Sequence, residues 1–598
     1  MRRSKPYLTG VLLASTFLSQ FVAPRPAAAQ DLVASEEIPG GSSVFVFRES
    51  RKKPQRHASG SARRRSGGAP RGVNAAVGTA AQKRRAAAIA RRKGGVTSAD
   101  RRVALSNTLT IKAEGFLDNN QTDLAITNYR SALAQNAKNT RAAEGLSNAL
   151  TAKGIDIAGD NNNADAIPLF EEAVKLDPQN DAALAKLGAI YDAKGENDKA
   201  IDFYQRAVAL NPEYVQLYPI LGIAYVEKGE IGKADDALKR SETAGINDAD
   251  VEFLRGLIAF KNNRNDEALA AFDKAGASDA RFAEAQYYRG QIYDRQGKQT
   301  EAIAQYRGAL RSDPTFAPAA FDLGVASYNA GDYNGAATAY QEAIKLDEGN
   351  AEAHANLAST YRQLERYPEA NAEYKTASTG IKNADLYSEW GYCLGKTTEW
   401  DKAVARLNTA AEMSPVAIDN SNVGWAYYNA GQFQTGAKND AAAKSDYELA
   451  RNSSQLAVNQ DPKFDAAYLN LGASHNALGE FQLAVNTLNA VLGLHSNWII
   501  AMNQLGYGYR GLGDFKNAIA IYKRAVDLDA RNTFGLFNLG EAYFSSGNKK
   551  EAKKINDKLR QIDPHLSVAL DNVYAGKAVL ENATRKVTDK IPRPKFPF

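Results

Sequence analysis

The side chains that most often perform chemistry are few in this sequence and lie far apart. Metal and catalytic sites gather such residues, and short motifs reveal them by their spacing. The 598 residues include one cysteine, Cys393, and five histidines. The histidines are His57, His354, His475, His495 and His565. None is spaced for a metal with another histidine or with Cys393, so we expect no metal site, and Cys393 is interpreted as a small core residue.

One stretch has part of the pattern of a phosphate-binding loop. Gly391 and Gly395 precede Lys396 and Thr397, the order found in loops that cradle phosphates. That loop needs four residues between its glycines, whereas only three lie between these two. The sequence also contains no Gly-x-Ser-x-Gly elbow and no dinucleotide fingerprint. We therefore expect a protein that is not an enzyme and has no cofactor.

The first 29 residues have the pattern of a secretory signal peptide. Arg2, Arg3 and Lys5 precede an apolar stretch over 8–23, and small residues at 27–29 follow. This order predicts cleavage between Ala29 and Gln30 and a secreted or periplasmic protein. A mitochondrial transit peptide is the lesser alternative, because no acidic residue precedes position 31.

Residues 30–102 are predicted to form a disordered basic arm or linker. Residues 48–102 carry 17 basic and two acidic side chains, a net charge of +15, within a chain whose net charge is +6. Few large apolar side chains lie between these charges, so little burial could offset the entropy of ordering. The candidate polyanion-binding residues are Arg63, Arg64, Arg65, Lys83, Arg84, Arg85, Arg91, Arg92 and Lys93. An anionic glycan or a membrane would suit them, but nucleic acid is disfavoured because 51–102 lacks aromatic residues for base stacking.

The rest of the chain repeats with a period of 34 residues. Leu-Gly pairs recur at this spacing, and an alanine follows each glycine by twelve residues. The glycines are Gly188, Gly222, Gly324, Gly472, Gly506 and Gly540. Several units close with Asp-Pro or Asn-Pro, as at Pro178 and Pro314, where proline would stop a helix.

This pattern resembles the tetratricopeptide repeat family over 106–564. The resemblance implies an all-α fold, a right-handed α-solenoid of about thirteen helix-turn-helix units over 103–564. A capping helix over 565–588 and a Pro-rich basic tail over 589–598 would follow. Two units are longer than the period, near 159–163 and 434–446, and we expect longer loops or helix extensions there.

The resemblance also implies a concave groove, lined by the first helix of each unit, that holds extended protein segments. The family's groove positions fall on amides interleaved with aromatic residues. These candidates are Asn356, Arg362, Tyr392, Asn422, Trp425, Tyr428, Asn470, Asn476, Asn503, Gln504, Tyr507, Arg510, Phe537 and Asn538. A side-chain amide both donates to and accepts from a peptide backbone without reading its sequence, and aromatic rings supply apolar contact area.

The function predicted from these observations is a non-enzymatic scaffold or adaptor in the cell envelope that binds extended protein segments in its concave groove. One alternative is a tether in which the arm over 48–102 binds a polyanion and the repeats present it. Another is an accessory subunit of a glycan-transfer or envelope-assembly complex.

Overall fold

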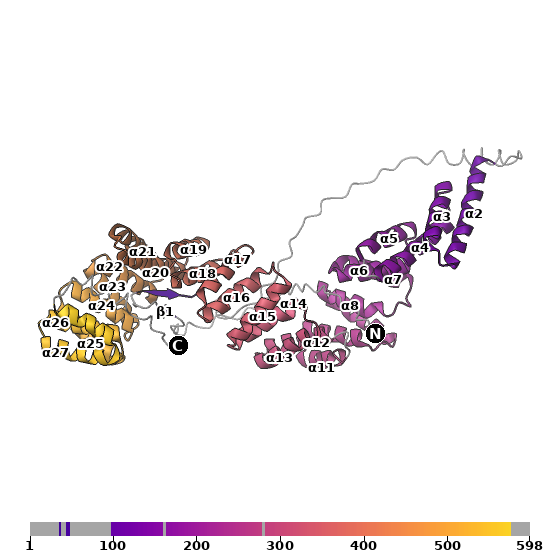
Figure 1. The fold of residues 1–598 in the computed structure, drawn as a ribbon. Coiled ribbons are helices and arrows are strands. Elements are labelled where there is room, and N and C mark those ends of the chain that lie inside the picture. The colour runs from indigo at the N-terminus through magenta and orange to yellow at the C-terminus, as the bar shows by residue number, and fades with distance from the viewer. Residues whose placement is uncertain (1–34, 38–42, 48–96, 160–162, 278–281, 576–598) are drawn as a thin grey trace. The chain divides into compact units, whose positions relative to one another are not determined.

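The computed structural model describes residues 35–37, 43–47, 97–159, 163–277 and 282–575. The predicted signal peptide over 1–29, the nine candidate polyanion-binding residues and the predicted tail over 589–598 lie outside these ranges. The described helices fall into two compact units. Unit 1 contains the described residues from 97 to 319, and unit 2 contains residues 35–37, 43–47 and the described residues from 320 onward (Figure 1).

Each unit is an α-solenoid of consecutive helix pairs. The helices of unit 1 are α2 Ser98–Asp118, α3 Thr122–Gln135, α4 Thr140–Gly159, α5 Asn163–Leu176, α6 Asp181–Ala193, α7 Asn197–Leu210, α8 Leu217–Lys228, α9 Ile231–Thr243, α10 Ala249–Lys261, α11 Asn265–Ala275, α12 Phe282–Arg295 and α13 Gln299–Ser312. The helices of unit 2 are α14 Ala317–Asn329, α15 Tyr333–Leu346, α16 Ala351–Gln363, α17 Tyr367–Ala377, α18 Ala384–Lys396, α19 Trp400–Met413, α20 Ala417–Gly436, α21 Asp440–Gln460, α22 Asp465–Ala477, α23 Phe481–Leu494, α24 Ile499–Gly511, α25 Phe515–Leu528, α26 Thr533–Ser545, α27 Lys549–Ile562 and α28 Pro564–Tyr574. Helices α2–α27 form thirteen pairs, which confirms the predicted architecture within the described residues.

Close approach of the two helices in a pair explains the small residue at the eighth place. A Cβ atom built on Gly188 of α6 would lie 2.5 Å from Cδ1 of Tyr204 on α7. No real Cβ tolerates that distance, so a larger residue would force the helices apart. Tyr204 is itself fully buried, as is Ala200 at the twentieth place. The small residues that recur at the eighth and twentieth places are therefore explained by the close packing of the two helices in each pair.

Short polar side chains begin many of the first helices. Asn180, Asn350, Asn383 and Asn532 precede α6, α16, α18 and α26, and each accepts a hydrogen bond from a backbone N–H in the first turn. Such caps satisfy N–H groups that have no partner inside the helix. Because the cap fixes where each first helix starts, it also fixes which side chains of that helix point the same way.

The two longer units prolong their helices. α4 has 20 residues, and α20 and α21 have 20 and 21, whereas most helices have 13 or 14. The expectation of longer loops or helix extensions thus resolves as helix extensions. Residues 160–162, inside the first of these insertions, lie outside the described ranges.

The last described helix, α28, covers the end of the repeats over a shorter range than predicted. Its buried Leu566 and Leu570 join a cluster that includes Leu559 of α27 and Leu539 of α26. Val568 of the same helix is 58% exposed. The remainder of the predicted helix over 576–588 lies outside the described residues.

Two three-residue strands are the exception to the all-helical fold. β1 spans Ser35–Glu37 and β2 spans Val44–Val46, and they pair antiparallel with Glu36 opposite Phe45. β2 contacts α20 and α22, and β1 lies in the same part of unit 2 (Figure 1). Residues 35–37, 43–47 and 98–102 of the region predicted as a disordered arm thus have defined structure, since β2 is buried against helices and 98–102 begin α2.

No described helix is both long enough and apolar enough to cross a membrane.

Candidate functional site

Two buried asparagines hold the backbone of β2 inside unit 2. Oδ1 of Asn470 accepts a hydrogen bond from the Val44 N–H at 2.7 Å, and its Nδ2 donates to the Val44 carbonyl at 2.8 Å. Asn422 makes the same pair of bonds with Val46, at 2.8 and 2.7 Å. Both asparagine side chains are fully buried. Each amide therefore satisfies both backbone groups of one strand residue, without any contact that depends on the strand's sequence.

The repeat positions these two amides. Asn422 and Asn470 are each the sixth residue of a first helix, α20 and α22, which belong to successive pairs. Residues two apart on a strand point their backbone groups to the same edge and lie about 6.6 Å apart. Successive repeats thus present amides that match alternate residues of one extended segment.

Neighbouring side chains fix the orientation of these amides and extend the contact. Nδ2 of Asn470 also donates to the carbonyl and to Oγ of Ser421, at 3.2 and 3.1 Å. Asn429 donates to Oγ of Ser43 at 3.0 Å, just before the strand begins. Asn429 also donates to the backbone carbonyl of Trp425 at 2.8 Å, which holds its side chain against α20.

The side chains of residues 44–47 alternate between two walls. Val44 and Val46 pack with an aliphatic cluster that includes Leu469 of α22. Phe45 and Phe47 pack with an aromatic cluster that includes Tyr392 of α18. We call the space between these walls, with Asn422 and Asn470 on its floor, the unit 2 groove.

The aromatic wall surrounds Phe45. Its ring centroid lies 5.0 Å from that of Tyr392 and 4.9 Å from that of Trp425, and Phe45 is fully buried. Phe47 lies 4.7 Å from Tyr392 and 4.9 Å from Phe45, in edge-to-face geometry. Edge-to-face pairs are favourable beyond the area that they bury. These contacts give the groove its main apolar binding surface.

A buried ion pair completes this wall. The guanidinium of Arg362 lies 4.5 Å from the ring centroid of Phe47, and its Nε lies 3.9 Å from Oε2 of Glu389. Oε2 of Glu389 also accepts hydrogen bonds from Ser359 and from the Tyr374 hydroxyl, at 2.8 and 2.5 Å. Burial disfavours the charge of Arg362, but Glu389, followed by Tyr374, Tyr328 and Cys393, together outweigh burial and raise the pKa of Arg362. The cation under Phe47 therefore stays charged.

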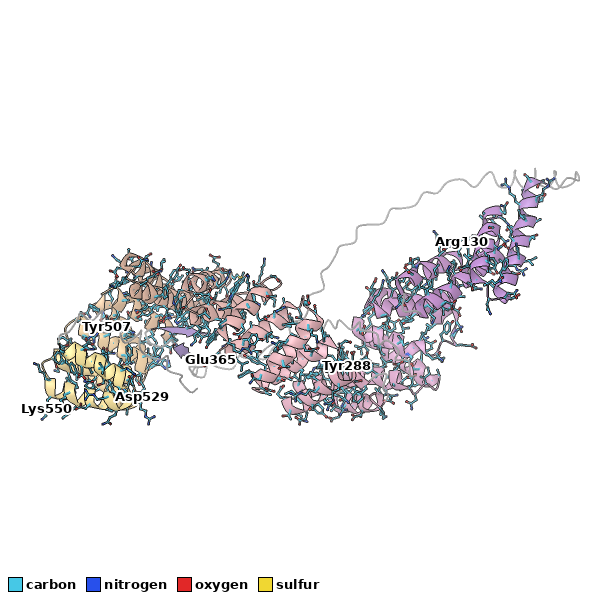
Figure 2. The ribbon with its side chains drawn as sticks, viewed as in Figure 1. Arg130, Tyr288, Glu365, Tyr507, Asp529 and Lys550 are labelled. Atoms are coloured by element: carbon cyan, nitrogen blue, oxygen red, sulfur yellow. The ribbon has the colours of Figure 1, made fainter. Side chains whose placement is uncertain are left out.

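Five of the predicted groove residues contact residues 43–47, and these are Arg362, Tyr392, Asn422, Trp425 and Asn470. Several of the other predicted residues make hydrogen bonds or ion pairs with other parts of unit 2. Asn476 donates to the carbonyl and to Oε1 of Gln504, both at 2.9 Å, and Arg510 pairs with Glu541. Asn538 donates to a carbonyl of its own helix, and Tyr507, labelled in Figure 2, is 39% exposed. The contacts with residues 43–47 described above do not involve the other predicted groove residues, which are Asn356, Tyr428, Asn476, Asn503, Gln504, Tyr507, Arg510, Phe537 and Asn538.

The sequence interpretation missed the segment in the groove and some of its supports. Ser421, Asn429 and Glu389 were not among the candidates, although Glu389 occupies the same sixth place as the two asparagines. The segment itself carries a signal, because Val-Phe-Val-Phe over 44–47 is rich in strand-forming residues. These four residues lie within the range over 30–102 that is predicted as an arm or linker.

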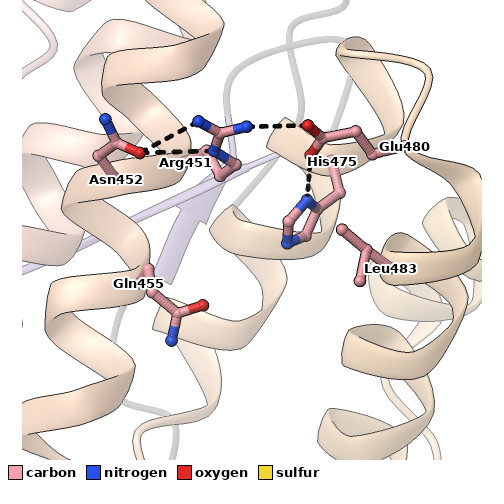
Figure 3. Close-up of a pocket in the computed structure, with 6 residues that line it drawn as sticks. All are labelled: Arg451, Asn452, Gln455, His475, Glu480 and Leu483. Carbon is pink, nitrogen blue, oxygen red and sulfur yellow. Dashed lines mark hydrogen bonds and ion pairs between the residues drawn. The ribbon is translucent and has the colours of Figure 1, made fainter.

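A shallow cavity of about 260 Å³ lies between α21, α22 and α23 (Figure 3). Oε1 of Glu480 accepts from Arg451 at 2.8 Å, and its Oε2 lies 2.5 Å from Nδ1 of His475. Burial opposes ionisation of Glu480, but His475 and Arg451 outweigh it and lower its pKa. Four of the side chains that line the cavity, Arg451, Asn452, His475 and Glu480, pair with one another. No cluster of three metal-ligating side chains occurs among the described residues. The cavity therefore carries no evident chemistry.

Unit 1 contains a carboxyl group with a raised pKa. Burial, followed by the charge of Asp192, raises the pKa of Glu227 on α8 from 4.5 to about 7. A hydrogen bond from Nδ2 of Asn197 at 2.7 Å acts in the opposite direction. In the folded state the carboxyl group of Glu227 is therefore mostly uncharged between pH 4.5 and about 7.

We expect Glu227→Gln to flatten the pH dependence of unfolding. Folded Glu227 keeps its proton between pH 4.5 and about 7 while the unfolded chain loses it, so its stabilising effect is full below pH 4.5 and lost as pH rises through 7. The change in the free energy of unfolding is at most about 3.5 kcal/mol, since the pKa rises from 4.5 to about 7 and each unit is worth about 1.4 kcal/mol. Urea unfolding followed by circular dichroism at pH 5 and 7.5 measures it. Glu213→Gln, at an exposed site, is the control, and an unchanged pH slope in Glu227→Gln would contradict the prediction.

Comparisons with known proteins agree with this architecture. Family models described as Tetratricopeptide repeat match residues 157–215, 221–280, 253–315 and 509–572, and one described as TPR repeat matches 327–364. The matched stretches are therefore similar to tetratricopeptide repeats. No curated protein matches the sequence.

Several solved structures resemble the chain. The crystal structure of the APC/C hetero-tetramer Cut9-Hcn1 is similar with 15% identity and a TM-score of 0.34, over 79% of this chain and 96% of that chain. The crystal structure of yeast Tom70 is similar with 16% identity and a TM-score of 0.29, over 81% and 96%. The IFIT1 monomeric mutant with Gppp-AAAA has 16% identity and a TM-score of 0.29, over 58% and 90%.

Proposed function

We propose that this chain, which carries tetratricopeptide repeats, is a non-enzymatic scaffold whose unit 2 groove binds an extended segment of a protein partner. Repeat solenoids of this kind generally act as protein-binding scaffolds, which supports the general class. The observation that carries the proposal is the seating of residues 43–47 between the two walls of the groove. These residues come from a remote part of the same chain and stand where a partner segment would lie.

The chemistry of the groove suits a peptide better than a small metabolite or a folded surface. Asn422 and Asn470 together make four hydrogen bonds to two alternate backbone residues. A hydrogen bond of this kind contributes about 0.5–1.5 kcal/mol net, and the aromatic wall adds apolar burial. Main-chain bonds that give affinity and side-chain pockets that give selectivity are the usual division in strand recognition.

The setting in the cell envelope is the less supported part of the proposal. It rests on the signal-peptide pattern over 1–29. N-terminal sequencing of the mature chain would find Gln30 first if that pattern is cleaved, and Met1 if it is not.

Peptide binding to the full chain tests the groove directly. The double variant Phe45→Ser with Phe47→Ser weakens the resident segment and opens the groove, because it removes both rings from the aromatic wall. A fluorescent peptide with the sequence of residues 42–48, SSVFVFR, is then titrated and followed by anisotropy. We expect saturable binding that falls at least tenfold when Asn422→Ala or Asn470→Ala is added.

The matched control is Asn489→Ala, an exposed asparagine on α23 whose Nδ2 lies 3.4 Å from the Tyr509 hydroxyl. It should leave the affinity unchanged. Binding that is unaffected by the loss of Asn422 and Asn470, or no binding to the opened chain, would show that this groove does not bind extended segments.

A further inference from the structure

The unit 2 groove offers different surfaces to alternate residues of its occupant. Val44 is fully buried and Val46 partly buried against the aliphatic wall formed by α22–α24. Phe45 is fully buried and Phe47 partly buried against the aromatic wall formed by α16, α18 and α20. The backbone contacts do not depend on the sequence of the occupant, whereas the two walls select for its side chains. A one-residue shift would place each side chain on the other wall.

The two rings have distinct surroundings on the aromatic wall. Phe45 contacts Tyr392 and Trp425, and Trp425 is held from behind by Trp400 at 5.5 Å between centroids. Phe47 contacts Tyr392 and lies over the Arg362 guanidinium, which gives a cation–π contact. Both places therefore favour an aromatic ring, and the second place gains from the charge beneath it.

The backbone contacts add a requirement at the residue between the two rings. Val46 both donates to and accepts from Asn422. Proline has no N–H and would leave the buried Oδ1 of Asn422 without this donor, at a cost comparable to a lost hydrogen bond. The sequence Phe596-Pro597-Phe598 of this chain has the same spacing of rings but a proline between them. It should therefore fit the aromatic wall poorly.

We propose that the partner segment recognised by this groove is a strand of the form aliphatic–Phe–aliphatic–Phe, in which the residue between the rings is not proline. This inference rests on the proposed function and specifies the class of ligand. The aliphatic residues meet the wall near Leu469, the rings meet Tyr392, Trp425 and Arg362, and Asn470 and Asn422 hold the backbone of the first and third residues.

A peptide series on the full-length Phe45→Ser, Phe47→Ser chain tests the inference. The reference is SSVFVFR, and the decisive comparison is SSFVFVR, which has the same composition with every apolar residue moved to the opposite wall. A third peptide carries Val46→Pro, and a fourth carries Phe45→Ala and Phe47→Ala. We expect each of the three to bind at least tenfold more weakly than the reference in a competition titration.

The outcomes separate this inference from the proposed function. If the shifted peptide competes as well as the reference, while Asn422→Ala still weakens both, the groove binds extended segments but does not read this pattern. If the proline peptide competes equally, the backbone requirement at the third residue is refuted. If no peptide binds at all, the proposed function fails first. Arg362→Met adds a check, since it should weaken the reference but not the peptide that lacks both rings.

Discussion

Replacing Asn470 with leucine should release residues 43–47 from the groove of the otherwise native chain. Leucine is similar in size but cannot pair with the N–H and carbonyl of the buried Val44. Each unpaired buried group costs about 1–3 kcal/mol, so the bound state loses about 2 kcal/mol or more. That loss corresponds to at least about thirtyfold faster amide exchange at residues 43–47, measured by hydrogen exchange with mass spectrometry.

A control separates release of the segment from unfolding of the repeats. Asn489→Leu makes the same chemical change on the exposed face of α23 and should leave exchange at 43–47 as it was. The exchange of α22 should also stay slow in Asn470→Leu, because only the segment leaves. Unchanged protection of Val44 in Asn470→Leu would mean that the amide contacts do not hold the strand.

Replacing Trp425 with alanine should destabilise unit 2 by about 3–5 kcal/mol, the usual cost of removing a buried large aromatic side chain. Trp425 is fully buried and contacts Phe45, Tyr392 and Trp400. Its indole also fills the space left by Gly395, where a Cβ would lie 2.6 Å from Cη2 of Trp425. The substitution would therefore leave a cavity that disrupts both the core of the repeat and the aromatic wall of the groove.

Urea unfolding monitored by tryptophan fluorescence reports this change for unit 2 alone. The four tryptophans of the chain are Trp390, Trp400, Trp425 and Trp498, and all lie in unit 2. Trp498→Ala is the matched control, because this side chain is only partly buried, and it should cost clearly less. A loss below about 1 kcal/mol in Trp425→Ala would show that the wall repacks.

The sequence predicted the helical architecture well because packing constraints recur in every repeat. In seven of the described repeats a glycine with positive φ, such as Gly195 or Gly229, follows the first helix. In five other units the same place holds a residue with a side chain, including Thr398 at φ 64° and Glu365 at 57° (Figure 2). The turn between the helices imposes this conformation, and the packing of both helices outweighs the local preference of threonine.

The groove was predicted only in part, because its contents depend on contacts between distant segments. The sixth-place amides follow from the repeat register, and Asn422 and Asn470 point into the groove accordingly. Asn476, at the twelfth place of α22, was predicted from the register as well, but it pairs with Gln504, and only the packed structure decides that pairing. Residues 44–47 cannot form a stable strand alone, since two short strands need a covering surface.

Val44 and Asn470 are 426 residues apart, so the segment is synthesised well before the groove that holds it. A ribosome adds about 5–20 residues per second, so Val44 leaves the ribosome on the order of 20–90 s before Asn470 is made. During that interval Val-Phe-Val-Phe has no groove of its own to enter, and a groove on a chain completed earlier is the first one available to it. The concentration of nascent chains, as well as the folded structure, therefore decides whether a segment ends in its own groove or in that of another molecule.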